Sequence, residues 1–186
     1  MKLKQEHFAR LSLKILSFLM QKKSLTMKMD EAAIKSTITT IFVQDALKIE
    51  NITKKAQTVM EQHKAKVQTG EIDYQKMFPM IKKELFKKEG LPLSETNYSE
   101  DHIKKLSLKI HDKLYLDNMV DYHDDEQSLM DIQHVMGEFF AIREKAVATA
   151  RQKVSSLSKN VAPGSNEWNV LFDKYLTEEL KKWGFH

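Results

Sequence analysis

Apolar residues recur along the chain at intervals of three and four positions, which is the spacing of a helical face and not that of a strand. The stretch LSLKI occurs at residues 11–15 and again at residues 106–110, and within those five letters it alternates as a strand would. In the wider window the helical period holds, so both copies are predicted to be helical. The apolar face around the first copy comprises Phe8, Leu11, Ile15 and Leu19.

The chain contains an internal repeat. The two copies of LSLKI lie 95 positions apart, and near the ends of the two halves KKEG (residues 87–90) corresponds to KKWG (residues 181–184) at a spacing of 94. Matches at both ends, in the same order, are hard to obtain by chance. The sequence therefore predicts two tandem homologous units, residues 1–92 and 99–186, joined by a linker at 93–98 and packed either separately or as one compact domain.

Each unit is predicted to contain about four helices, which gives an all-α, pseudo-twofold helical bundle. In the first unit Asp30, Asn51 and Asp73 are expected to cap the second, third and fourth helices, and Gly90 to end the last one. The second unit repeats the plan from a cap at Ser99. The chain has only 5 Gly and 3 Pro, which favours long helices with few corners.

The first helix of each unit carries a second apolar stripe, roughly 140° around the helix from the first at about 100° per residue. A helix that is apolar on two sides is usually covered on two sides. The second stripe is therefore predicted to pack one unit against the other, or against another chain. It comprises Leu13, Leu16 and Met20 in the first unit and Leu108, His111 and Tyr115 in the second.

The composition removes several classes of function. The chain has no cysteine, so disulfides, thiol nucleophiles and cysteine-based metal sites are excluded. Its five glycines form no phosphate-binding loop, and no metalloprotease or serine-hydrolase motif is present. No window reaches the ~20 apolar residues of a membrane span. We expect a cytoplasmic protein with no cofactor, and the sequence favours a protein that is not an enzyme.

The richest polar cluster is DYHDDE at residues 121–126. One interpretation is a weak cation-binding site formed by Asp121, His123 and Asp124. A metal-dependent enzyme would use Asp131 in addition to these three residues. The alternative, which the letters favour, is a loop in which Asp124 or the next residue caps the following helix. His7 and His102 occupy equivalent positions in the two units, either as a paired site or as ordinary polar residues of a first turn.

Charge is distributed unevenly along the chain. Residues 1–95 hold 18 Lys/Arg against 11 Asp/Glu, whereas residues 96–186 hold 12 against 15. The simpler explanation is that the two halves present solvent-exposed faces of opposite net charge, which attract each other. The alternative is that the basic first half binds nucleic acid. The lysines expected to contact nucleic acid are Lys54, Lys55, Lys64, Lys66, Lys82, Lys83, Lys87 and Lys88.

The ends of the two units, GEIDYQKMFPMIKKELFKKEGL (residues 70–91) and APGSNEWNVLFDKYLTEELKKWG (residues 162–184), resemble the signature ends of the bacterial domain of unknown function 507 family. The resemblance covers essentially the whole chain. It implies a helical, bacterial, cytoplasmic protein and brings no activity, cofactor or catalytic residue with it.

Three functions compete on the sequence. The leading one is a non-enzymatic protein-interaction or scaffold module, whose partner is an unknown protein or a second copy of the chain. The second is nucleic-acid binding through the basic half, and the third is a metal-dependent enzyme.

Overall fold

The computed structural model describes residues 5–71, 73–91, 98–157 and 165–182, and this part of the chain is all-helical apart from one short strand pair. The all-α prediction is confirmed. The predicted linker falls almost wholly on residues 92–97, outside the described residues. In chain order the elements are α1 (Gln5–Gln21), β1 (Leu25–Met27), α2 (Glu31–Gln62), α3 (Lys64–Gln68), α4 (Tyr74–Lys88), α5 (Glu100–Leu116), β2 (Val120–Tyr122), α6 (Asp125–Ser155) and α7 (Asn166–Lys182).

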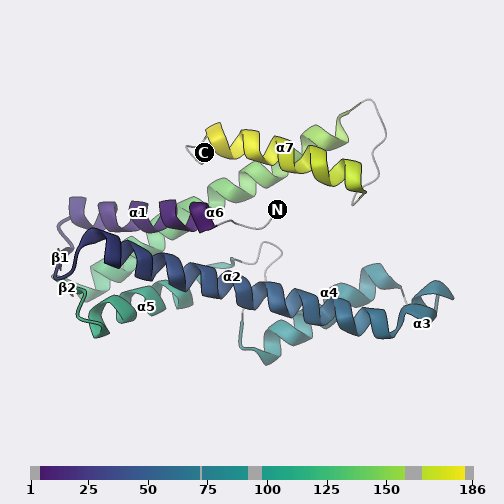
Figure 1. The fold of residues 1–186 in the computed structure, drawn as a ribbon, viewed down its shortest axis with the longest axis horizontal. Helices are drawn as coiled ribbons and strands as arrows, with labels where there is room; N and C mark the ends of the chain where they lie inside the picture. Colours follow the sequence, from purple (N-terminus) through teal and green to yellow (C-terminus); the bar gives the residue numbers. More distant parts are fainter. Residues whose placement is uncertain (1–4, 72, 92–97, 158–164, 183–186) are drawn as a thin grey trace.

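Four helices, two from each half of the chain, form the base of the molecule (Figure 1). Helix α1 packs against α2 and α6, and α5 packs against α6 and α2. Both copies of LSLKI are helical, as predicted, one in α1 and one in α5. The apolar face predicted for the first copy is the buried face of α1. Its residues, each at most 1% exposed, are Phe8, Leu11, Ile15 and Leu19.

The helices α2 and α6 are longer than the sequence predicts, with 32 and 31 residues. The pattern predicts a break at Asn51, but α2 runs through this residue without a cap. The reason is that the buried positions continue across it at helical spacing, through Ile49, Ile52 and Ala56, with neither Gly nor Pro to interrupt them. The second and third helices predicted in each unit are therefore one helix.

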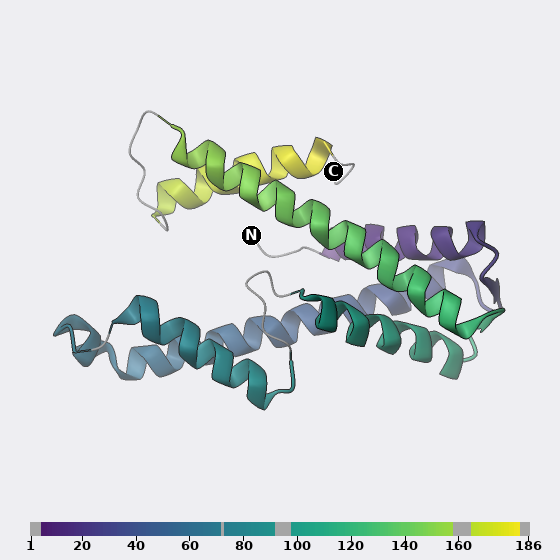
Figure 2. The same cartoon turned by 180° about the vertical axis from the view of Figure 1, so that it is seen from behind.

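Beyond the base, α2 and α6 diverge and each carries one further helix (Figures 1 and 2). Helix α4 packs along the second half of α2, and α7 packs along the second half of α6. We call the first pair, with α3, the α2–α4 arm and the second pair the α6–α7 arm. Phe86 of α4 joins the main core, whereas α7 packs on α6 through a separate small cluster. The arms thus differ in how they are attached.

The predicted helix ends agree with the structure at most positions. Asp30 and Ser99 accept backbone N–H bonds at the starts of α2 and α5, at 2.9 Å and 3.3 Å. Asp73 caps α4 in the same way, and Gly90 follows that helix with a φ of 65°. Pro79 lies inside α4 without ending it. Pro163 and Gly164, a pair typical of a break between helices, lie outside the described residues.

The two strands were not predicted, because three residues are too few to show a period. They pair antiparallel with Thr26 opposite Asp121, so the central pair joins positions 95 apart. The turns before them also match at this spacing: two residues after the end of α1 and of α5 comes a residue with positive φ, Lys23 at 57° and Asn118 at 55°. In both places the backbone N–H of the next residue donates to a carbonyl of the preceding helix, Ser24 to Leu19 and Met119 to Leu114.

Candidate functional site

The second stripe is only partly buried. Leu16 is completely buried and His111 is 9% exposed, so these two belong to the interior. The two halves meet through α1 against α6, α2 against α5, and the strand pair. The other members of the stripe face solvent on the outer sides of α1 and α5. They are Leu13 (38% exposed), Met20 (41%), Leu108 (48%) and Tyr115 (56%).

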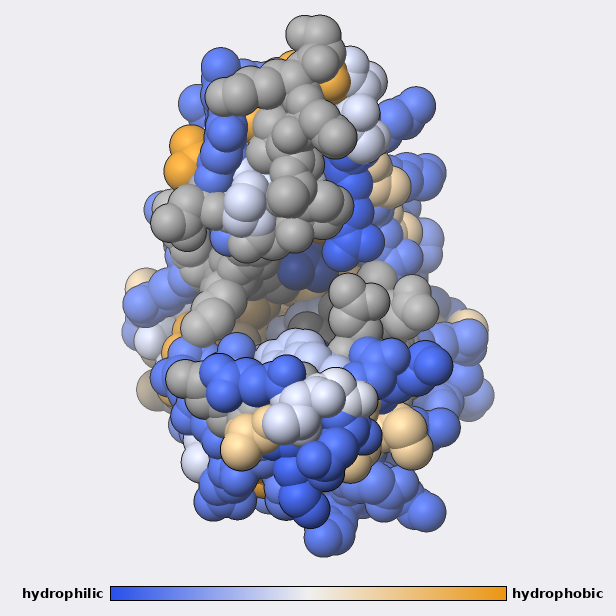
Figure 3. Space-filling model, turned by 90° about the vertical axis from the view of Figure 1, so that its right-hand side faces the viewer, coloured by the Kyte–Doolittle hydropathy of each residue, from blue (hydrophilic) through white to orange (hydrophobic). Residues whose placement is uncertain are grey.

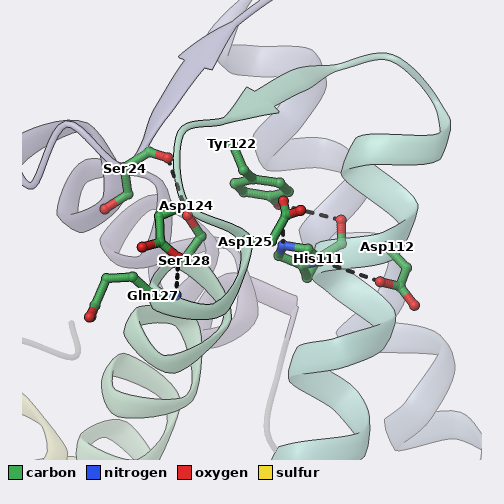
Figure 4. A network of polar contacts seen from close by, with 8 residues as sticks. All are labelled: Ser24, His111, Asp112, Tyr122, Asp124, Asp125, Gln127 and Ser128. Carbon is green, nitrogen blue, oxygen red and sulfur yellow. Dashed lines mark hydrogen bonds and ion pairs between the residues drawn. The ribbon is translucent and has the colours of Figure 1, made fainter.

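The DYHDDE segment is built around helix capping and ring stacking (Figure 4). Asp124 caps α6 by accepting from the N–H of Gln127 at 2.9 Å, which confirms the capping alternative. Tyr122 stacks on His111 with ring centroids 4.1 Å apart, and His111 faces the carboxylates of Asp112 and Asp125. Burial raises the pKa of Tyr122, and the charges of the two carboxylates raise it further.

The other candidate metal ligands hold the two halves together. His123 places one ring nitrogen 2.8 Å from the Thr26 hydroxyl and the other 2.8 Å from the Lys23 carbonyl. Asp121 pairs with Lys28 across the strand ladder. Asp131 is buried and accepts from Ser24 and Gln127. Within the described residues no group of three or more His, Asp or Glu side chains is placed to hold a metal ion.

The lysines predicted to contact nucleic acid all lie on the α2–α4 arm. Lys54 pairs with Glu50 and Lys55 with Glu89, whereas Lys82 is half-buried with its ammonium 5.6 Å from the centre of the Phe86 ring. Burial lowers the pKa of Lys82. Of the others, Lys64 and Lys66 lie in α3, and Lys83, Lys87 and Lys88 lie in α4, the last three exposed.

The basic bias is not confined to the first half of the chain, whose residues 1–47 hold eight Lys/Arg against four carboxylates. Residues 48–91 hold ten lysines against six carboxylates, and the described residues 141–157 and 165–182 hold seven Lys/Arg against five. The acidic bias lies in residues 98–140, with ten carboxylates against four lysines. Both arms are therefore basic, and the acidic region is the α5 side of the base.

A cleft of about 630 Å³ lies where the two arms leave the base. In Figure 3, which looks at the molecule from the arm ends, the arms are separate masses with a hollow between them. The wall along α2 is largely apolar, and Lys82 of α4 and Arg143 of α6 lie at the lining from opposite arms. The apolar lining residues are Phe8, Val43, Ala46, Leu47 and Ile49.

At the inner end of this cleft lies a buried polar cluster that the sequence did not reveal. His102 Nε2 is 2.8 Å from Asp45 Oδ2, with the two side chains 2% and 9% exposed. Tyr98 stacks edge-on against His102 and face-on against Phe140. Burial, and then the charge of Asp45, raise the pKa of the Tyr98 phenol, while Arg143 acts in the opposite direction. The repeat identified His102 as a candidate site residue, but it did not identify its partner, Asp45.

The comparison with known proteins confirms the family resemblance found in the sequence. The model of a family described as "Protein of unknown function (DUF507)" matches residues 1–185. No curated protein matches the chain. Among the helices of the described residues, none combines the length and apolar character needed to cross a membrane.

Proposed function

The chain belongs to the DUF507 family, and we propose that it acts as a non-enzymatic protein-interaction or scaffold module. The observation that carries the proposal is the exposed part of the second stripe on α1 and α5. Leu13 and Met20 leave α1 on the side away from its buried face, and Leu108 and Tyr115 do so on α5. Large apolar side chains at equivalent exposed positions on the two helices offer a contact for another protein on each of the two sides of the base.

We further propose that the chain is an internal duplication, with homologous units at residues 1–92 and 99–186, in a bacterial cytoplasmic protein. The matched helix ends at Lys23 and Asn118 support this, since a non-glycine residue with positive φ is uncommon and here recurs 95 positions later. The strand register supports it as well, because Thr26 pairs with the residue 95 positions further on. The base would then be a pseudo-twofold bundle.

The interaction surface is tested with the double variant Leu13→Lys, Leu108→Lys. Both side chains are exposed, so the melting temperature should stay within a few degrees of the parent. A charge at each site should abolish self-association seen by light scattering, or release any protein captured on the immobilised parent chain. The matched control is Met80→Lys, Val170→Lys, which alters apolar residues on the arms that are more exposed, at 63% and 69%. A parent chain that is strictly monomeric and captures nothing would refute the proposal, as would an equal effect of the control.

Nucleic-acid binding is the second candidate, and the observation favouring it is that both arms are basic. Binding of a duplex or single-stranded oligonucleotide, followed by fluorescence anisotropy, should weaken steeply as salt rises. Lys83→Glu, Lys87→Glu should weaken it and reduce the salt slope by about one for each phosphate that is no longer neutralised. Lys22→Glu, Lys109→Glu, which changes two exposed lysines outside the arms, is the matched control. Absence of binding at low salt would eliminate this function.

A further inference from the structure

The cleft between the arms combines an apolar wall with cations that have no carboxylate partner among the described residues. Arg143 and Lys82 are half-buried, and neither lies within ion-pair distance of a carboxylate among the described residues, although the charge of Glu144 acts on Arg143 from further away. Glu50 is the one acidic residue among the described lining, and it pairs with Lys54. Asp45, behind the lining, already pairs with His102. A partly buried cation without a counter-ion is costly, and an anionic ligand would compensate it.

Arg143 and Tyr98 together form a suitable receptor for one carboxylate. The guanidinium presents several donors in a planar fork that matches carboxylate geometry. The Tyr98 hydroxyl is buried and lines the cleft. It lies close enough to the Asp45 carboxylate for that group to raise its pKa, but it makes no hydrogen bond of good geometry with a described residue. Burial lowers the pKa of Arg143, which reflects the same loss of water around the guanidinium. The polar end of a ligand would therefore lie at the inner end of the cleft.

The rest of the cleft suits an apolar tail. Leu47 is 51% exposed although it lies beside the buried Phe8 and Ile49, so apolar surface is open to solvent along α2. A volume of about 630 Å³ falls within the range of ligand pockets, about 300–1,000 Å³, which are mostly apolar with a few placed polar groups. We propose that this cleft binds a small amphiphilic carboxylate, with the carboxylate on Arg143 and Tyr98 and the tail along α2. Lys82 adds positive charge from the opposite arm.

The proposal goes beyond the protein-interaction function, because Leu13 and Leu108 do not line the cleft. It is tested with the full chain by isothermal titration with decanoate, with decanol and acetate as probes that carry only the tail or only the charge. Decanoate should bind saturably with one molecule per chain, and both partial probes should bind at least about tenfold more weakly.

Two variants and their controls place the ligand. Arg143→Gln should weaken decanoate binding at least about tenfold, whereas Arg151→Gln, an exposed arginine of the same helix outside the cleft lining, should not. Leu47→Glu, which changes an exposed residue and so spares folding, should weaken it as well, and Met80→Glu is its control. Lack of saturable binding, equal binding of decanol, or equal effects of variants and controls would overturn the proposal. So would preferential binding of a peptide with an apolar C-terminus.

Discussion

Replacing Asp45 by leucine is expected to destabilise the protein by about 3 kcal/mol or more, since it leaves His102 buried without its partner. The two side chains come from α2 and α5, so their contact joins the two halves of the chain inside the base. His102 has no other means of compensation, because its Nδ1 atom is buried without a hydrogen bond among the described residues. The measurement is the free energy of unfolding in urea.

The double variant Asp45→Leu, His102→Leu tests whether the lost stability comes from leaving one buried polar group without its partner. Removing both polar groups removes the desolvation cost together with the hydrogen bond, so the double variant should recover most of the missing stability. Glu138→Leu is the matched control, because Lys14 and Glu138 also join the two halves but remain about half exposed. It should leave the urea midpoint nearly unchanged. A double variant as unstable as the sum of the single changes would show that the pair is not what stabilises this contact.

The Asp45–His102 pair shows which contacts can be predicted from the sequence and which cannot. His102 stands out because it repeats His7 and follows an acid, both of which are local features. Asp45 is 57 positions away in sequence, and no pattern links it to His102. A signal was nevertheless present: Asp45 occupies a position in the buried stripe of α2, between Phe42 and Ile49, where an ionisable residue needs a partner. Its presence there predicts a buried pair, although not the identity of the partner.

The predicted helix ends are right where a single capping residue determines them. They are wrong where a capping residue and a continuous apolar period favour different structures. The caps at Asp30, Ser99 and Asp124 depend on a side chain reaching an N–H three residues on, so the letters alone suffice. At Asn51 a capping residue competes with an uninterrupted apolar period, and packing of the period prevails because it adds burial over several turns. The two arms exist because α2 and α6 continue beyond the base. The sequence did not predict helices of this length, so it could not predict the cleft between the arms.

Replacing Leu176 by aspartate is expected to detach α7 from α6 and leave the base folded. Leu176 is 2% exposed, and an unpaired carboxylate there costs several kcal/mol. Its surroundings form a cluster separate from the main core, held also by Glu179, whose pKa is lowered by hydrogen bonds from Lys153 and Lys182. Hydrogen exchange should show α7 losing protection while α1 and α5 keep theirs.

This experiment distinguishes cooperative folding units from sequence repeats. If residues 99–186 folded as an independent domain, α5 and α7 would lose protection together, because both lie in that unit. If the base of α1, α2, α5 and α6 is the cooperative unit, α5 should stay with α1, since the buried residues of both helices belong to one core. Leu114→Asp, at a completely buried position of α5, is the matched control and should unfold both halves at once. Loss of protection in α5 but not α1 upon Leu176→Asp would instead favour residues 99–186 as a folding unit of their own.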